Sequence, residues 1–268
     1  MAATGTEPRG QRALVTGASG GIGLELARVL AREGCHLVIS ARTHSALETV
    51  ARDLSSSYNV AVHVVAADLA TPDGARALMK EVASAGLDID LLVNNAGFGL
   101  FGVFATTPLE DEQRMIDLNI SALVTLTKLC LPGMLARRLG RVLNVASTAA
   151  FLPGPNMAVY YASKAFVLSF SEAIADELRE SGVTVTVLCP GPTATGFQDA
   201  ARMQKSRLVQ GAMMSAAEVA EAGYRGLMAG RRVVTPGATN RMVPWLVRLT
   251  PRRLTTILSR RAAEILHR

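Results

Sequence analysis

The chain holds 268 residues, of which 49% are hydrophobic, 19% charged and 4% aromatic. This length suits one large domain with an extensive core, and the composition excludes a disordered chain. Residues 231–268 contain nine arginines and one acid, a charge of +8 within a whole-chain net charge of +6, so residues 1–230 carry −2. A slightly acidic body argues against a nucleic-acid-binding surface over the main domain.

The cysteines and histidines indicate no disulfide framework and no metal site. The three cysteines stand singly in apolar surroundings, and none of the four histidines has ligand spacing. No uninterrupted apolar run approaches the ~18 residues of a membrane span, and the first residues lack the basic and apolar regions of a signal peptide. We therefore predict buried free thiols and a cytoplasmic protein.

A glycine-rich loop follows the first predicted strand, at residues 11–16. The loop runs G-A-S-G-G-I-G from Gly17 to Gly23, and an amphipathic helix covers about 22–33. A strand, a glycine turn and a helix in this order bring backbone N–H groups and a helix N-terminus to a phosphate. The spacing differs from the generic dinucleotide fingerprint, so a purely structural turn remains an alternative.

The same loop satisfies G-x-S-x-G around Ser19, the nucleophile elbow of α/β-hydrolases. That elbow needs an oxyanion loop from an earlier strand, and fewer than twenty residues precede Ser19. A hydrolase triad also needs a late histidine, and the only one after His63 is His267, in the basic tail. These absences disfavour a hydrolase.

The second predicted strand, at residues 36–41, ends at Arg42. In dinucleotide folds an acid at this place binds the 2′-hydroxyl of NAD, whereas an arginine accommodates the 2′-phosphate of NADP. The segment S-A-R-T around Arg42 contains no carboxylate, which predicts NADP(H). The alternative is a solvated arginine that opens the next helix.

Strands and helices alternate along the remaining chain. Further strands are predicted at 60–66, 90–93, 141–146 and 183–188, and helices at about 44–57, 72–86, 108–118 and 159–180, with an apolar periodic segment reaching 137. This alternation predicts βαβ units, hence an α/β fold with a parallel sheet and right-handed crossovers. We expect a flexible N-terminus at 1–10, one domain at 11–238, and a basic amphipathic helical tail at 239–268.

Three polar side chains stand close together between Ser147 and Lys164. Ser147 follows a predicted strand, and Tyr160 and Lys164 lie four residues apart on a predicted helix, so they share a face. A nearby cation favours the phenolate and lowers the pKa of a phenol from about 10. The pattern favours a tyrosine acid/base with a serine that orients a carbonyl. An ordinary helix start with two tyrosines is the alternative.

These signals occur in an order that resembles the short-chain dehydrogenase/reductase family over about residues 11–195. The similar motifs are the cofactor loop T-G-x-x-x-G-x-G (Thr16, Gly17, Gly21, Gly23), N-N-A-G (Asn94 to Gly97), the catalytic serine with Y-x-x-x-K (Ser147, Tyr160, Lys164), and P-G-x-x-x-T (Pro190, Gly191, Thr195). The resemblance implies a single Rossmann-type doubly wound parallel sheet of about seven strands in the order 3-2-1-4-5-6-7, with helices on both faces.

The resemblance also implies an NADPH-dependent oxidoreductase that interconverts a carbonyl and an alcohol. Tyr160 would act as acid/base, Ser147 would stabilise the alkoxide, Lys164 would lower the tyrosine pKa and hold the nicotinamide ribose, and Asn119 would hold a relay water. The residues expected to bind the cofactor are Gly17, Ser19, Gly21, Ile22, Gly23, Arg42, Asp68, Leu69, Asn95, Ala96, Gly97, Tyr160, Lys164, Pro190, Gly191 and Thr195. A non-catalytic NADP-binding scaffold of the same fold is the alternative.

One departure from the family concerns cofactor choice. Many NADP-preferring members carry a second basic residue inside the glycine loop, where this chain has Ser19 and Gly20. The prediction of NADP therefore depends on Arg42 alone.

The segments expected to face the substrate are mostly apolar and lack a cluster of cations. They are residues 98–101, 151–153, Met157 and the stretch after Thr195, of which 199–214 is predicted to form a lid. We therefore expect a hydrophobic ketone or aldehyde. By resemblance, segments 119–138 and 159–180 should join subunits into a homodimer or homotetramer.

The basic tail has an amphipathic pattern. Leu254, Ile257, Leu258, Ala262, Ile265 and Leu266 recur at helical spacing, arginines take the other faces, and residues 242–247 add an apolar segment with Trp245. Such a helix can lie on an anionic membrane surface. Packing on a neighbouring subunit or on its own domain remain alternatives.

Overall fold

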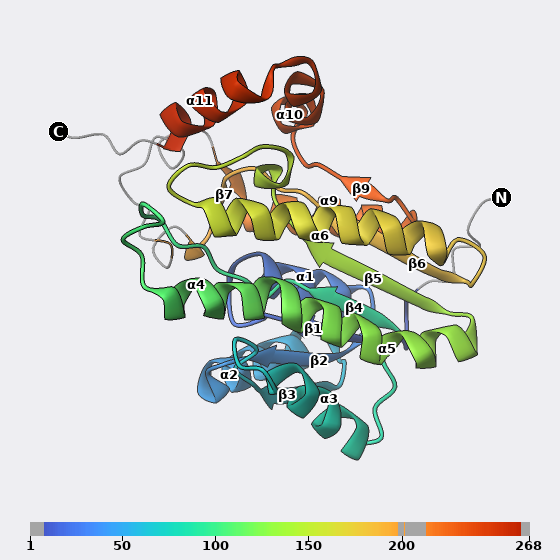
Figure 1. Ribbon diagram of the computed structural model, residues 1–268. Helices are drawn as coiled ribbons and strands as arrows, with labels where there is room; N and C mark the ends of the chain where they lie inside the picture. The colour runs from blue at the N-terminus through green and yellow to red at the C-terminus, as the bar shows by residue number, and fades with distance from the viewer. Residues whose placement is uncertain (1–7, 198–200, 202–212, 264–268) are drawn as a thin grey trace.

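The computed structural model describes residues 8–197, 201 and 213–263, and its centre is a parallel sheet (Figure 1). The seven strands lie in the order β3-β2-β1-β4-β5-β6-β9, and every neighbouring pair is parallel. Their bounds are β1 Arg12–Thr16, β2 His36–Ala41, β3 Val62–Ala66, β4 Leu91–Asn94, β5 Gly140–Val145, β6 Val183–Leu188 and β9 Val233–Val234. The predicted fold class and strand order are therefore confirmed; β9 is the predicted seventh strand of the sheet. A separate pair joins β7 (Thr193–Ala194) to β8 (Met214–Ser215).

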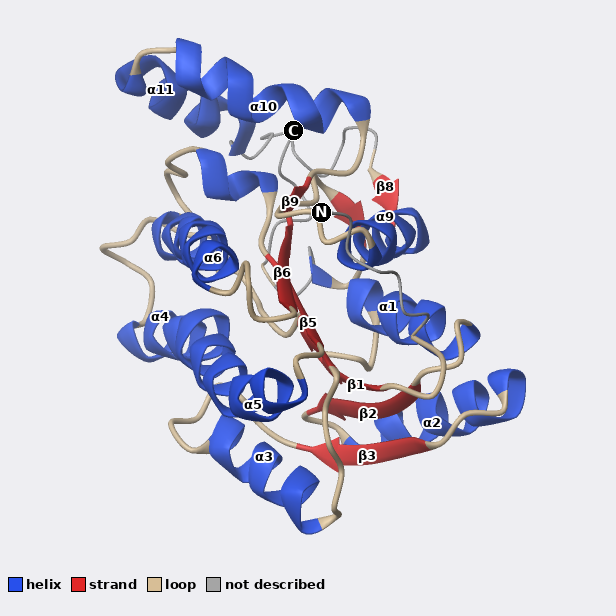
Figure 2. Ribbon diagram, turned by 90° about the vertical axis from the view of Figure 1, so that its right-hand side faces the viewer, coloured by secondary structure: helices blue, strands red, loops and turns tan. Residues whose placement is uncertain are grey.

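Helices cover both faces of the sheet, as Figure 2 shows. One face carries α1 (Gly21–Arg32), α2 (His44–Tyr58) and α9 (Ala216–Met228), and the other carries α3 (Gly74–Ser84), α4 (Leu109–Ile116), α5 (Leu123–Arg137) and α6 (Ala158–Glu177). The tail forms α10 (Ala238–Leu249) and α11 (Arg252–Ala263), beyond the sheet and α6. Ile265 and Leu266 lie outside the described residues.

The central strands are apolar on both sides because each side enters a different core. Val15 and Ile39 pack under α1 and α2, while Leu14 and Val38, one residue before each, pack under α3 and α5. A parallel sheet covered on both faces requires this pattern of near-continuous apolar strands. The three cysteines are free and buried, as predicted.

Helices α4 and α5 form one continuous rod that contains a π-helical turn at Asp117–Ala122. By length and composition alone, the rod Leu109–Arg137 is long and apolar enough to cross a membrane, with 39% of the relevant window buried. Core helices meet the same criterion, and here Leu126, Cys130 and Met134 pack in the core beneath α5. The π-helical turn places Asn119 inside the rod, at a kind of irregularity that is frequent at functional sites.

Loops that carry the predicted motifs meet at one edge of the sheet. The glycine loop follows β1, the N-N-A-G segment follows β4, Ser147 follows β5, and Pro190 follows β6. Because all these strands run parallel, their carboxyl ends lie together and form the crevice where open α/β sheets bind ligands.

Candidate active site

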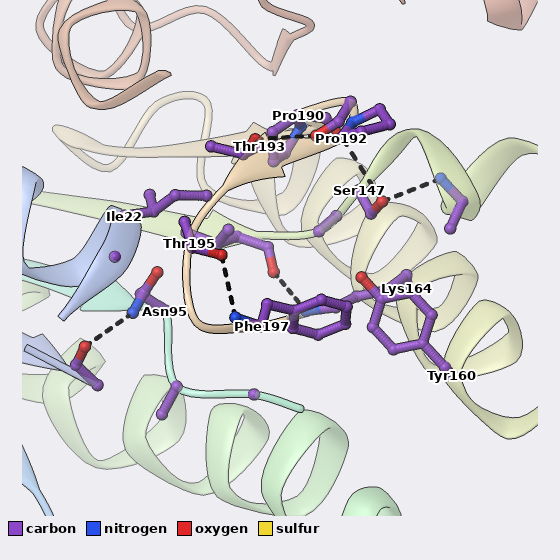
Figure 3. Close-up of a pocket in the computed structure, with 18 of the residues that line it drawn as sticks. Ile22, Asn95, Ser147, Tyr160, Lys164, Pro190, Pro192, Thr193, Thr195 and Phe197 are labelled. Carbon is purple, nitrogen blue, oxygen red and sulfur yellow. Dashed lines mark hydrogen bonds between the residues drawn. The ribbon is translucent and has the colours of Figure 1, made fainter. Parts of the chain in front are cut away.

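A cleft of about 430 Å³ opens at this edge, and Figure 3 shows the side chains around it. Thirteen predicted site residues line it: Gly17, Ser19, Gly21, Ile22, Asn95, Ala96, Gly97, Ser147, Tyr160, Lys164, Pro190, Gly191 and Thr195. Five predicted residues do not line it: Gly23, Arg42, Asp68, Leu69 and Asn119. The structure therefore brings most of the predicted site residues together in the cleft, and the other five lie outside its lining.

The glycines of the loop after β1 are required by backbone geometry. Gly17 and Gly21 have φ of +67° and +56°, in the left-handed region where side chains are strained. Gly23 is required for a different reason, because a Cβ there would clash with the Gly17 carbonyl oxygen and the Asn95 side chain. Gly23 therefore allows the Gly17 carbonyl and the Asn95 side chain to pack closely against the start of α1.

We predict that Gly23→Ala lowers the free energy of unfolding by about 1–3 kcal/mol, the usual cost of overpacking a tight site. Gly20→Ala is the matched control, since Gly20 has an extended backbone and a Cβ there meets nothing within 4 Å. Urea unfolding of both variants provides the measurement. Equal stability of the two variants would contradict this role for Gly23.

Thr16 joins the glycine loop to the segment after β4, a role that the sequence analysis missed. Its Oγ1 donates to the Val93 carbonyl (3.2 Å) and accepts from the backbone N–H groups of Asn95 and Ala96 (3.0 Å each). The Asn95 side chain returns a hydrogen bond to the Thr16 carbonyl (2.9 Å) and a longer one to Gly17 (3.3 Å). The signal was present as the first letter of the T-G-x-x-x-G-x-G motif. Asn95 thus lines the cleft while its amide N–H groups hold the loop.

Ser147, Tyr160 and Lys164 converge on the cleft from two elements (Figure 3). Ser147 ends the connection after β5 and caps the short 3-10 helix Thr148–Phe151, where its Oγ accepts from the Ala149 N–H (3.1 Å). Tyr160 and Lys164 extend from adjacent turns of α6, with the Lys164 Nζ 5.9 Å from the centre of the Tyr160 ring. The predicted sharing of one helix face is therefore observed.

The electrostatics of the pair differ from the sequence prediction. Burial raises the pKa of Tyr160, the nearby Ser147 hydroxyl partly offsets the rise, and Tyr161 adds to it. Burial also lowers the pKa of Lys164 to about 8. The Lys164 Nζ donates to the Val145 carbonyl (2.9 Å), away from the phenol oxygen. The predicted lowering of the Tyr160 pKa by Lys164 is not observed in this structure, because burial has the largest effect on that pKa and Lys164 is not among the groups that shift it.

Asn119 is buried and uses its amide to join the loop after β4 to α6. Its Nδ2 donates to the Phe98 carbonyl and to Ser163 Oγ (3.0 Å each), and its Oδ1 accepts from the Phe98 N–H (3.1 Å). A Cβ on Gly97 would lie 3.0 Å from the Asn119 Oδ1 and 3.4 Å from the Lys164 Nζ. Asn119 and Lys164 therefore approach Gly97 together, although neither bonds directly to the other.

The opposite end of the crevice contains the residues predicted to hold adenosine. Arg42 is exposed after β2, and Asp68, after β3, binds Arg114 Nη2 (3.0 Å) and the Ala70 N–H (3.0 Å). Burial acts to raise the pKa of Asp68, yet the Ala70 amide, Arg114 and Arg42 together lower it. Leu69 is buried in the core, so only its backbone is available to a ligand.

The substrate side of the cleft is apolar. The ring of Phe197 lies 5.3 Å from that of Tyr160, centre to centre, and Phe101, Leu152 and Met157 belong to the same cluster. This agrees with the predicted hydrophobic lining. The predicted lid at 199–214 lies largely outside the described residues.

Comparisons with known proteins agree with the geometry of the site. The model of the short chain dehydrogenase family matches residues 11–206. The chain is 40% identical over 183 residues to a very-long-chain 3-oxoacyl-CoA reductase of Pyrenophora tritici-repentis, which covers 66% of this chain and 53% of that protein. It is 37% identical over 188 residues to the 17-beta-hydroxysteroid dehydrogenase type 3 of Mus musculus, covering 69% and 61%.

Solved structures lead to the same family. A short-chain dehydrogenase from Sphingobium yanoikuyae in complex with NADPH superposes with a TM-score of 0.79 at 32% identity, covering 85% of this chain and 88% of that one. The chain spans about half the length of the first curated relative that it matches. With the family model matched over most of its length and the family's motifs gathered in one cleft, the chain belongs to the short-chain dehydrogenase/reductase family.

Proposed function

We propose that the protein is an NADPH-dependent oxidoreductase that interconverts a carbonyl and an alcohol on an apolar substrate. The observation that carries this proposal is the meeting of Ser147, Tyr160 and Lys164 in one cleft with the glycine loop. A proton donor, a hydroxyl for the substrate oxygen and a cation are the groups that carbonyl reduction needs beside a hydride donor.

The residues present fit a dinucleotide. Gly17 and Gly21 adopt left-handed backbone conformations with no side chain at either position, and the N-terminus of α1 at Gly21 offers backbone N–H groups and a partial positive charge to a pyrophosphate. Arg42 and Asp68 would hold the adenosine end, and Lys164 and Thr195 the nicotinamide end. When bound, the nicotinamide supplies the hydride.

The proposed proton chemistry belongs to α6. In the direction of reduction, the Tyr160 hydroxyl donates its proton to the substrate oxygen, and the Ser147 hydroxyl donates a hydrogen bond to the developing alkoxide. A raised pKa keeps Tyr160 protonated at neutral pH, which suits a proton donor. Lys164, with a pKa of about 8, remains mostly protonated at pH 7 and stabilises the tyrosinate that is left behind.

The apolar cluster beside Tyr160 supports a hydrophobic substrate. Phe101, Leu152, Met157 and Phe197 provide no cation for an anionic headgroup. The names of the two relatives, a very-long-chain 3-oxoacyl-CoA reductase and a 17-beta-hydroxysteroid dehydrogenase, also support an apolar carbonyl compound. NADPH oxidation against a panel of long-chain and cyclic ketones tests this; turnover confined to small polar ketones would contradict it.

We predict that Arg42→Ser raises the dissociation constant for NADPH by about tenfold to a hundredfold, the value of a charge-assisted hydrogen bond. NADH binding should remain unchanged, since it lacks the 2′-phosphate. Arg52→Ser, which removes an exposed arginine within α2, is the matched control. Fluorescence titration of the unaltered protein and both variants with NADPH and with NADH measures the six dissociation constants. Tighter binding of NADH than NADPH by the unaltered protein would overturn the preference.

We further propose that the chain acts as a homo-oligomer in the cytoplasm, with residues 11–238 as the catalytic domain. Leu129 and Leu135 on α5 and Phe166 on α6 are exposed, and Phe166 stacks on Phe170 at 5.7 Å. Exposed apolar side chains on two adjacent helices support a subunit interface there. Light scattering that gives a monomer at micromolar concentration would contradict this part of the proposal.

A further inference from the structure

The last two helices expose their apolar residues. Helix α10 contains no fully buried residue, and its large apolar side chains share one exposed stripe at helical spacing: Met242, Trp245, Leu246 and Leu249. Trp245 is 69% and Leu249 is 83% exposed. A helix that belonged only to the domain core would turn this stripe inward.

Helix α11 also exposes its large apolar residues. Its buried residues are polar, Thr255 (6% exposed) and Ser259 (4%), which lie one helical turn apart. Its large apolar residues, Leu254, Ile257 and Leu258, are about half exposed. Helix α11 therefore turns a polar side toward the domain, whereas the half-buried side of α10 consists of Asn240, Val243, Pro244 and Val247. Both helices turn their large apolar side chains away from the domain.

The inner sides of the two helices contact the domain near the cleft. The Asn240 side chain donates to the Pro236 carbonyl (2.8 Å) and lies against Gly191 of the cleft, where a Cβ would meet it. Burial raises the pKa of Tyr161, and the neighbouring Ser259 hydroxyl opposes this shift. The inner sides of α10 and α11 thus contact residues of the active-site cleft, which leaves the outer sides without a partner among the described residues.

Only positive charges accompany the exposed stripe. Residues 238–263 contain six arginines and no acid, and all six arginines are exposed: Arg241, Arg248, Arg252, Arg253, Arg260 and Arg261. None of them forms an ion pair with a residue that the structure describes. Arg241 and Arg248, and likewise Arg253 and Arg260, lie seven residues apart, so each pair follows one border of the apolar stripe.

We propose that this outer face of α10 and α11 lies on the surface of an anionic lipid bilayer. We call it the tail face and define it as Met242, Trp245, Leu246, Leu249, Leu254, Ile257 and Leu258, together with the six exposed arginines of the two helices. An apolar stripe enters the boundary between headgroups and acyl chains, arginines attract anionic lipids, and tryptophan favours this interface. The contact is peripheral and needs no membrane-spanning segment.

The charges favour a bilayer over a second copy of the chain. A two-fold contact would set six arginines against six others with no acid in either helix, and like charges brought together in an interface are unfavourable. An anionic lipid surface neutralises the same arginines. Helices α10 and α11 also lie together at the outside of the molecule in both views, so both can meet one surface (Figures 1 and 2).

Trp245 is the only tryptophan of the chain and reports directly on the tail face. Adding vesicles of phosphatidylcholine with phosphatidylserine to the full-length protein should shift its emission to the blue, because the indole leaves water. Vesicles of phosphatidylcholine alone should give little shift. High salt should weaken the binding, since arginine attraction to the surface is screened. Absence of a shift with anionic vesicles, or an equal shift with neutral ones, overturns the proposal.

Matched variants separate charge from apolar contact. Arg241→Gln with Arg248→Gln should weaken vesicle binding about 25-fold, at roughly fivefold for each arginine near the surface. Arg52→Gln with Arg76→Gln, two exposed arginines elsewhere, should change it little. Leu249→Ser should weaken binding, whereas Leu109→Ser, at a residue 63% exposed on α4, should not. Vesicle co-sedimentation measures the binding of all four variants, and NADPH binding checks that each variant is folded.

Self-association is the competing outcome. If the protein forms larger species that Leu249→Ser dissociates, and vesicles do not bind it, the tail face is a subunit interface and the proposal is wrong. Normal binding of both control variants to vesicles, with loss of binding in both tail variants, supports it. Turnover of a water-soluble ketone should be equal in all these variants, which distinguishes this result from a failure of the proposed enzyme activity.

Discussion

Replacing Tyr160 with phenylalanine should lower turnover by about a thousandfold while leaving NADPH affinity unchanged. General acid catalysis of this kind contributes about 10²–10⁴-fold, and phenylalanine lacks the proton that the substrate oxygen must receive. The ring remains, so its packing at 5.3 Å against Phe197 survives. Ketone-dependent NADPH oxidation measures turnover, and quenching or shift of NADPH fluorescence measures binding.

Tyr161→Phe is the matched control for this experiment. Tyr161 is the neighbouring tyrosine, its ring centre lies 6.0 Å from that of Tyr160, and it has no lysine four residues further on. Its hydroxyl faces α11, so its loss should leave most of the turnover in place. If Tyr160→Phe keeps full turnover, or Tyr161→Phe loses it equally, the assignment of the proton donor is wrong.

The second large effect concerns Lys164, which is only 6% exposed and whose pKa burial lowers from 10.5 to about 8. Between these two pH values the folded protein has released the lysine proton while the unfolded chain still holds it. Unfolding then takes up a proton, so the free energy of unfolding rises with pH across this window. A pKa difference of this size corresponds to about 3 kcal/mol. Below pH 8 the buried, protonated Lys164 lowers the free energy of unfolding by this full amount.

Lys164→Met should remove this pH dependence together with turnover. Compared with the unaltered protein, the variant should gain stability at pH 7, and the gain should shrink as pH rises from 8 toward 10.5. Urea unfolding of both proteins at several pH values measures the difference, in which titrations common to both cancel. Lys128→Met, at an exposed lysine of α5, is the control. A gain for Lys164→Met that does not vary with pH would contradict the lowered pKa.

The order of elements could be predicted because buried parallel strands have a simple signature. The apolar segments that became β2 and β6 begin and end at the expected residues, and the motif-bearing loops follow strands as expected. Since parallel strands share one carboxyl edge, strand order and loop positions were enough to gather Gly17, Ser147 and Tyr160 in one cleft. Periodicity predicted the alternation of strands and helices, whereas the strand order and the roles of the motifs were implied by the resemblance to the family.

Features that depend on three-dimensional neighbours could not be predicted. The role of Thr16 arises from backbone N–H groups about eighty residues away, and the π-helical turn at Asn119 leaves no mark in a pattern of apolar spacing. The raised pKa of Tyr160 reflects how far the surrounding protein removes the phenol from water, which a four-residue spacing from Lys164 does not report. In each case the deciding quantity is a contact or a degree of burial.

The tail shows the same limit in another form. The spacing of Leu254, Ile257 and Leu258 predicted an amphipathic helix, and α11 is one. Periodicity gives the existence of an apolar side but not its direction. Only the burial of Thr255 and Ser259 shows that the polar side faces the domain, which makes the apolar side available to a partner.

The proposed activity is hydride transfer from NADPH to a carbonyl carbon in the cleft, with Tyr160 as the proton donor. NADPH carrying deuterium at both C4 positions, incubated with the protein and an apolar ketone, tests this most directly by mass spectrometry of the alcohol. We expect one deuterium on the carbinol carbon with the unaltered protein and only background alcohol with Tyr160→Phe. Saturable NADPH binding without any deuterated alcohol across the ketone panel would contradict it and would favour a non-catalytic scaffold.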